Sequence, residues 1–161
     1  MSIEDVVVDT NVLMHASNPN EKRHQDSVEF VENLLESDTK LCIDEGFDLD
    51  ETANRSLIGQ EYLKHLVFGQ VGAALLVSLA QSQRLSFVPC AVSGQARNLI
   101  DQAVKKPRDR TFVRVAVNST ENTLVTHDFE DFPVKIRKLF GKKIGVTLCT
   151  AEVGNAKITA S

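Results

Sequence analysis

Short apolar runs alternate along the chain with longer segments in which apolar residues recur every three or four positions. The runs predict strands at residues 6–8, 41–43, 123–126 and 146–149, and residues 86–89 could also be extended. Continuous β-branched and aliphatic runs of this length are typical of strands that are buried on both faces of a parallel sheet.

Helices are predicted between these strands, where the apolar positions follow helical spacing. Their ranges are 11–17, 21–37, 51–68, 71–84, 95–104, 109–117 and 134–140. Pro107 breaks the chain before Asp109, which opens the sixth helix, and Gly141 is a plausible stop for the seventh. Strands that are joined through helices imply right-handed crossovers. The predicted fold class is therefore α/β, a three-layer α/β/α sandwich around a mainly parallel sheet.

A length of 161 residues suits one domain, and no repeat or linker divides it, so we expect a single domain over residues 1–161. Three cysteines without a CxxC spacing predict free and mostly buried thiols in a reducing compartment. The first residues carry no basic segment followed by an apolar one, and the longest apolar stretch, residues 71–80, is too short to span a bilayer. These features predict a soluble cytoplasmic protein that does not associate with membranes.

The formal net charge of -4 argues against binding of nucleic acid through global charge alone. It does not argue against a nuclease, because such an enzyme concentrates acids in a metal site where bound cations reverse the local sign. The glycines form neither a GxGxxG pattern nor a P-loop, which excludes a Rossmann dehydrogenase and a P-loop triphosphatase.

Carboxylates follow three of the predicted strands. Asp9, Asp44 and Asp128 each come at or just after a strand end, and a parallel sheet brings such ends to the edge where ligands bind. Asp109 and Glu61 share apolar faces of predicted helices and should point toward the protein body. Buried carboxylates repel one another unless a cation compensates them, and their hard oxygens suit Mg²⁺ or Mn²⁺. The sequence therefore predicts a metal site.

Each acid also has a purely structural explanation. Asp9 could end a strand or cap a helix, Asp109 could be a helix N-cap, Glu61 a solvated helix residue and Asp128 a turn residue. The stretch 44–51 reads mostly as a solvated acidic loop, which could supply a further ligand or none.

Four segments together resemble the motifs of the PIN-domain family. They are residues 6–13, residues 58–62, residues 109–113 with Ala116, and residues 124–128 with 129–132. The resemblance runs from about residue 5 to residue 149, and it implies the PIN-like version of the α/β/α sandwich. It also implies metal-dependent cleavage of phosphodiester bonds, usually in RNA, with Mg²⁺ or Mn²⁺ as cofactor.

By this resemblance Asp9, Glu61, Asp109 and Asp128 are the catalytic metal ligands, with Asp131 in reserve. The expected substrate-binding residues lie beside these acids in the sequence: Asn11, Thr126, Arg108, Arg110 and Lys135. Asn11, Thr10 and Thr126 could instead orient Asp9 or another ligand. Many small family members are toxins of toxin–antitoxin pairs, so an antitoxin or another protein partner, and a homodimer, are expected possibilities beside the RNA substrate.

Two rival hypotheses remain open at this point. A catalytically silent PIN-like module would bind RNA or a protein without cutting. A phosphatase-like hydrolase would use Asp9 as nucleophile, although the usual second Asp two residues later is replaced by Asn11. His127 departs from the small residue that many family members have there, and it could approach the substrate.

Overall fold

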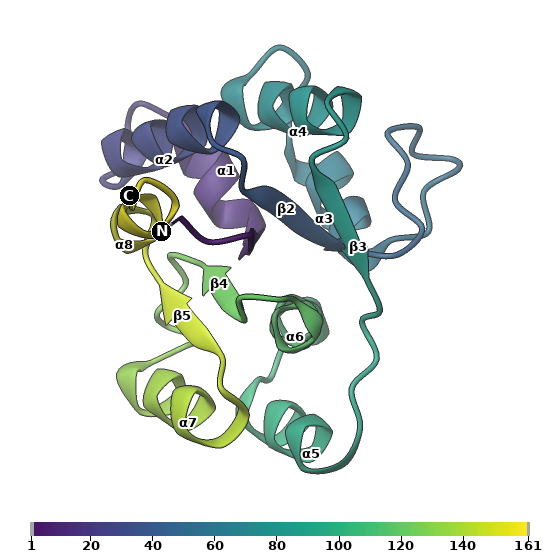
Figure 1. The fold of residues 1–161 in the computed structure, drawn as a ribbon, viewed down its shortest axis with the longest axis vertical. Helices are drawn as coiled ribbons and strands as arrows, with labels where there is room; N and C mark the ends of the chain where they lie inside the picture. Colours follow the sequence, from purple (N-terminus) through teal and green to yellow (C-terminus); the bar gives the residue numbers. More distant parts are fainter. Residues whose placement is uncertain (1, 161) are drawn as a thin grey trace.

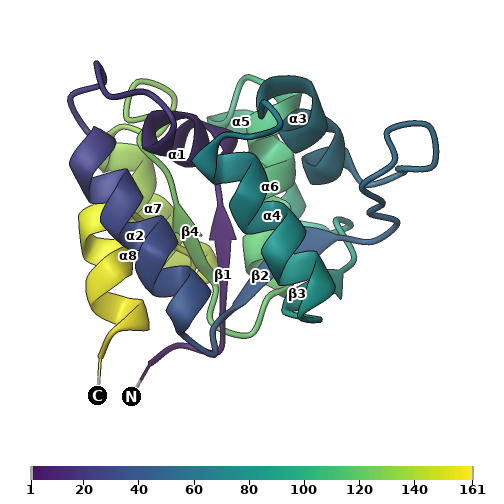
Figure 2. The ribbon, with the colours of Figure 1, turned by 90° about the horizontal axis from the view of Figure 1, so that it is seen from above.

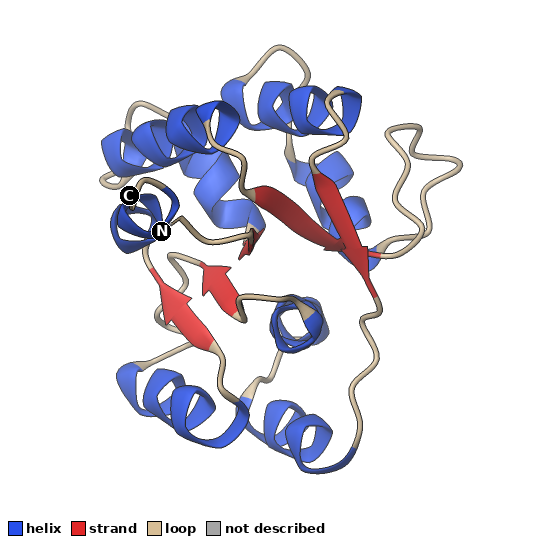
Figure 3. Ribbon diagram, in the orientation of Figure 1, coloured by secondary structure: helices blue, strands red, loops and turns tan. Residues whose placement is uncertain are grey.

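The computed structural model describes residues 2–160 and contains one five-stranded parallel sheet. The strand order is β3-β2-β1-β4-β5, and every pairing is parallel (Figure 1, Figure 3). The strands are β1 (Asp5–Val8), β2 (Lys40–Asp44), β3 (Leu85–Val88), β4 (Thr123–Val125) and β5 (Thr147–Cys149). The predicted parallel sheet is confirmed, and the segment that could be extended is the edge strand β3.

Helices cover both faces of the sheet, which confirms the three-layer α/β/α class (Figure 1, Figure 2). The helices are α1 (Thr10–Ala16), α2 (His24–Glu36), α3 (Leu57–His65), α4 (Val71–Gln81), α5 (Gly94–Ala103), α6 (Pro107–Asn118), α7 (Val134–Ile144) and α8 (Ala151–Ile158). One layer contains α1, α2, α4 and α8, which pack on one another, and the other contains α5, α6 and α7. Helix α3 packs against α6 and β2 and also contacts α1.

The core explains why these strands form. All residues of β1 are buried, and Val6, Val7 and Val8 are fully so. Cys42 and Cys149 are buried free thiols, as predicted, whereas Cys90 is only half-buried. None of the helices in residues 2–160 is long and apolar enough to cross a membrane.

Several predicted helix boundaries are wrong by two or more residues, and three of them have a clear local cause. The helix predicted to start at residue 51 begins at Leu57, because Ser56 and a buried carboxylate cap it there. Gly141 does not end α7, which continues to Ile144 and stops at Gly145, whose φ of 69° is the left-handed conformation that glycine adopts readily. Asp109 does not open α6 either. Pro107 occupies the first helical position, and Asp109 lies in the first turn.

Helix α8 was not predicted. Its eight residues do not place apolar positions on one clear helical face, so the sequence did not indicate a helix. In the structure the Thr150 side chain caps the helix by accepting a hydrogen bond from the Val153 amide. Packing supplies the missing stabilisation, since α8 lies against α2. Gly154 faces Val125 and Phe30 so closely that an added Cβ would lie 2.8 Å and 3.2 Å from their side chains.

The acidic stretch 44–51 is not uniformly solvated, as its first residue is buried. Asp44 is 3% exposed. It accepts hydrogen bonds from the Ser56 hydroxyl at 2.5 Å and from the backbone amides of Leu57 and Ile58 at 2.7 and 2.9 Å. Asp44 therefore caps the N-terminus of α3 and fixes the position of that helix.

Candidate metal centre

Strands β1 and β4 are neighbours, and their carboxyl ends bring two site residues together. Val8 is in register with Val125, and the Asp9 amide donates to the Val125 carbonyl at 2.9 Å. Asp9 is 6% exposed, and its Oδ2 accepts hydrogen bonds from the Thr126 hydroxyl at 2.9 Å and the Asn11 amide at 3.3 Å. Both donors bind the same carboxylate oxygen, so they hold Asp9 in one orientation.

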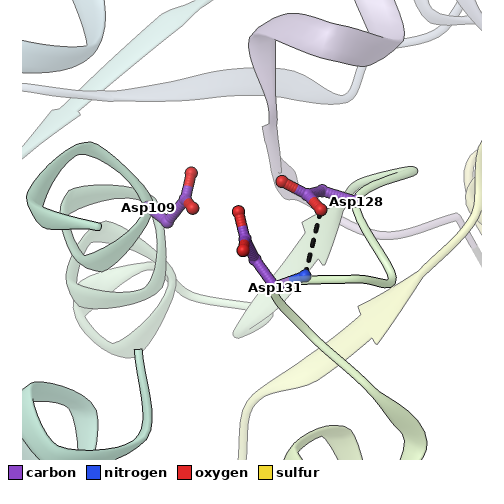
Figure 4. Close-up of side chains that lie close together, drawn as sticks. All are labelled: Asp109, Asp128 and Asp131. Carbon is purple, nitrogen blue, oxygen red and sulfur yellow. Dashed lines mark hydrogen bonds between the residues drawn. The ribbon is translucent and has the colours of Figure 1, made fainter. Parts of the chain in front are cut away.

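Three further carboxylates meet beside this edge of the sheet (Figure 4). Asp109 projects from the first turn of α6, whereas Asp128 and Asp131 come from the loop after β4. Each offers an oxygen, and these oxygens all lie within 4.8 Å of one another. The Asp131 amide donates to Asp128 Oδ1 at 3.1 Å, which closes the loop and aims both side chains toward Asp109.

A cleft of about 260 Å³ opens onto these acids. It is lined by all four residues that the sequence predicted as ligands: Asp9, Glu61, Asp109 and Asp128. Glu61 extends from α3, and its Oε2 lies 3.4 Å from Nε2 of His65 one turn later. The structure thus brings residues from β1, α3, α6 and the loop after β4 to one cleft.

Burial and mutual repulsion disfavour ionisation of these carboxyls. Burial is the main cause that raises the pKa of Asp9 to about 6, and hydrogen bonds from Thr126 and Asn11 oppose it. The pKa of Asp109 is raised to about 7, first by burial and then by Asp131, Asp9 and Asp128. Burial likewise raises the pKa of Asp128. Ionisation of these clustered carboxyls therefore costs free energy, which a bound cation would offset.

Lys106 is the nearest compensating charge. Its Nζ lies 2.9 Å from Oδ2 of Asp131, and this contact lowers the pKa of the Asp131 carboxyl. Asp131 is the reserve ligand of the sequence prediction, and the structure places it within the cluster. Nothing in the local sequence indicates its partner, because Lys106 precedes it by a helix and a strand.

The predicted substrate-binding residues have different surroundings. Arg108 lines the acidic cleft, so its position fits that prediction. Lys135 is exposed in the first turn of α7. The Arg110 guanidinium donates to the carbonyls of Val104 at 2.6 Å and Asp101 at 3.1 Å, so it anchors the end of α5.

Asn11 and Thr126 are engaged with Asp9, which corresponds to the orienting role that the sequence allowed. Thr10 is 5% exposed, and its hydroxyl has no hydrogen-bond partner among residues 2–160. It lines the same cleft as Asp9.

His127 is occupied within the protein. Its Nε2 accepts from the Ala151 amide at 3.1 Å, which leaves the ring proton on Nδ1, 2.9 Å from Nδ1 of His15. Burial is the main cause that lowers the pKa of His127 to about 4, so the ring is neutral at pH 7. With both nitrogens engaged, His127 supports the loop that carries Asp128, and it is not free to bind a substrate.

The donor set fits a hard divalent cation. The converging groups are carboxylate oxygens, which Mg²⁺ and Mn²⁺ prefer. Oδ2 of Asp109 is buried and has no hydrogen-bond partner among the described residues, an arrangement that is costly without a ligand. Asp109, Asp128 and Asp131 present oxygens close enough to share an ion, and Asp9 and Glu61 line the same cleft as Asp109 and Asp128, so these five residues are the ones that could hold it.

Comparisons with known proteins add little to this picture. No protein-family model matches the chain, and no curated protein matches its sequence. A solved structure that does match is a chain in the crystal structure of VapBC2 from Rickettsia felis bound to a DNA fragment from their promoter. The match covers 91% of this chain and 98% of that one, at 14% sequence identity and a TM-score of 0.45. The chain is an α/β/α sandwich with an acidic cleft at the carboxyl edge of its parallel sheet.

Proposed function

We propose that this protein is a metal-dependent endoribonuclease that hydrolyses RNA phosphodiester bonds with Mg²⁺ or Mn²⁺. The observation that carries the proposal is the meeting of Asp9, Asp109 and Asp128 in one cleft, with a buried Asp109 oxygen that lacks a partner. The resemblance of four sequence segments to PIN-domain motifs supports the same conclusion and supplies the choice of RNA.

The protein's own residues supply orientation and charge. Thr126 and Asn11 fix Asp9, and the loop hydrogen bond from the Asp131 amide fixes Asp128. Arg108 stands at the cleft, where its guanidinium can bind a phosphate of the substrate. Such fixed ligands lower the cost of organising the site when the substrate arrives.

A divalent ion held by these carboxylates would activate a water for attack on phosphorus and stabilise the negative charge that develops on the phosphoryl and leaving oxygens. Ionisation of Asp9 and Asp109 is needed to hold it. We therefore expect protons and the cation to compete for the same oxygens.

The resemblance extends the proposal to the protein's partners. A role as the toxin of a toxin–antitoxin pair would add an antitoxin as protein partner, and a homodimer is the corresponding proposal for self-association. Co-purification with the product of a neighbouring gene, and the mass of the purified protein in solution, test these two points separately.

The decisive test of the enzyme is cleavage of labelled single-stranded RNA by the wild type and by Asp9→Asn in Mn²⁺, Mg²⁺ and EDTA. We expect cutting that needs both the metal and Asp9, while circular dichroism shows that the variant is folded. Full activity in Asp9→Asn would contradict the proposal. RNA binding by the wild type without any metal-dependent cutting would favour the alternative, a catalytically silent PIN-like module.

A further inference from the structure

Two arginines from distant parts of the chain converge on one aromatic ring, that of Phe129 in the loop after β4. The guanidinium carbon of Arg137, from the first turn of α7, lies 4.3 Å from the centre of the Phe129 ring. The guanidinium carbon of Arg23, which precedes α2, lies 5.5 Å from the same centre. Both distances are within the range of cation–π contacts. Phe129 directly follows the proposed ligand Asp128, so this group is attached to the loop that carries two acids of the metal centre.

Neither guanidinium is neutralised within residues 2–160. No carboxylate of the described chain lies within 4.0 Å of the nitrogens of either arginine. Arg137 donates from Nε to the Phe132 carbonyl at 3.0 Å, which fixes the plane of its guanidinium but leaves its charge uncompensated. Within the described chain Glu130, which follows Phe129 in the sequence, forms no ion pair with either arginine, and neither does Glu21 or Asp26.

Two helix N-termini add to the positive field at this place. Arg23 is the N-cap residue of the 13-residue helix α2, and Arg137 lies one turn into the 11-residue helix α7. Neither helix has a side-chain hydrogen bond that caps its N-terminus. The amides of a first helical turn and the helix dipole favour anions. The loop before α2 and the loop after β4 lie at the end of the molecule where α1 begins (Figure 2).

We propose that Arg23 and Arg137, stacked on Phe129, form a phosphate-binding site that holds the backbone of single-stranded RNA beside the scissile bond. Arginine suits this role because its planar fork binds phosphate oxygens bidentately while its face remains on an aromatic ring. Phe129 is a positioning residue, since it holds both guanidiniums through their faces. The site supplies the local positive charge that the overall composition lacks. The position beside a scissile bond rests on the proposed nuclease function. The binding of RNA by these arginines does not depend on cleavage.

The experiment measures binding of labelled single-stranded RNA by fluorescence anisotropy over a range of salt concentrations. An Asp9→Asn background with Mg²⁺ keeps the RNA intact. We expect Arg23→Gln and Arg137→Gln each to weaken binding several-fold. Each should also reduce the slope of log K against log salt by about 0.7, the value for one lost phosphate contact on a single strand. Phe129→Leu should weaken binding as well, and Arg137→Lys should retain part of the affinity because it keeps the charge.

Lys142→Gln is the matched control, because it removes the same charge from the last turn of α7, where Lys142 is exposed. It should leave affinity and salt slope unchanged. An unchanged slope in the double arginine variant, an equal effect of Lys142→Gln, or no RNA binding by the parent would each overturn the phosphate site. Cleavage by the wild type is scored separately. If it cuts RNA and the arginine variants keep its KM, the phosphate site is wrong and the nuclease stands. If RNA binding depends on the arginines but the wild type does not cut RNA, the phosphate site stands and the nuclease proposal is wrong.

Discussion

The substitution Asp109→Asn should separate the effect of the acidic cluster on stability from its role in metal binding. Asp109 is 4% exposed and faces other carboxylates, and Oδ2 has no partner among residues 2–160. Asparagine keeps the shape of the side chain and removes its charge. We expect the variant to be more stable than the wild type without metal and to lose most of its affinity for Mn²⁺.

The pKa of Asp109 gives the magnitude. It is raised from 3.8 to about 7 in the folded protein, so the fold binds this proton more tightly than the unfolded chain does. The stability that protonated Asp109 contributes is therefore fully present below pH 3.8 and is lost as the pH rises through about 7. One pKa unit corresponds to about 1.4 kcal/mol, so ionisation of Asp109 costs on the order of 4 kcal/mol at pH 8. The amide of asparagine needs a partner of its own, and we expect a net gain of about 2–4 kcal/mol.

The assay is urea unfolding in EDTA at pH 8, with thermal melting as a second readout. The gain corresponds to a rise in Tm of roughly 5–15 °C for a domain of this size. At pH 4 the difference should nearly vanish, because wild-type Asp109 is then protonated. With saturating Mn²⁺ the difference in stability between Asp109→Asn and the wild type should narrow or reverse, because binding stabilises the wild type by about 2.7 kcal/mol at 100 times Kd.

The exposed helical residue Glu32 provides the matched control, since Glu32→Gln also removes one negative charge. It should leave stability almost unchanged at both pH values. If Asp109→Asn were as stable as the wild type or less stable in EDTA at pH 8, ionised Asp109 would not destabilise the fold, and the reasoning would be refuted.

Three further predictions follow from the same contacts. Mn²⁺ affinity measured by calorimetry should fall as the pH drops from 8 to 5, because Asp109, with a pKa of about 7, and Asp9, with a pKa of about 6, take up protons that the ion must displace; a flat profile would contradict this. Thr126→Val should lower Mn²⁺ affinity by about 10-fold, because Asp9 loses a hydrogen bond that orients it and the Asp128 amide loses its acceptor; unchanged affinity would show that these bonds are dispensable. Asp44→Ala should lower the free energy of unfolding by about 2–3 kcal/mol in urea titrations, because three donors at the start of α3 lose their acceptor; a loss below about 0.5 kcal/mol would remove Asp44 as the cap.

Much of the fold was predictable from local pattern. The apolar runs that form β1, β2, β4 and β5 are buried strands, and parallel pairing follows from the helices between them. The rule that parallel strands end at one edge then places Asp9 and Asp128 close together. Helical periodicity adds Asp109 and Glu61, since it turned both side chains toward the protein body, where Asp109 is buried and Glu61 lines the cleft.

The remaining features depend on contacts between distant segments. The pairing of Lys106 with Asp131 depends on the path of the loop after β4. Likewise the meeting of Arg23 and Arg137 on Phe129 needs the tertiary placement of α2 and α7. Neither follows from spacing along the chain.

One error came from treating a polar residue as solvated. Asp44 looked like the first residue of an exposed acidic loop, but it is buried as the cap of α3. The Arg110 guanidinium, predicted to bind phosphate, also donates to two carbonyls at the end of α5, which its sequence position did not indicate. A sequence does not reveal which polar side chains are consumed in capping, because their backbone partners leave no signature.

The most direct test of the central claim is the anomalous scattering of Mn²⁺ in crystals of the protein grown with that ion. The account predicts a peak in the cleft, bound by oxygens of Asp9, Asp109 and Asp128, and loss of that peak in Asp9→Asn. A peak at another group of acids, such as the exposed residues of the loop before α3, or no peak in the cleft at saturating Mn²⁺, would contradict it.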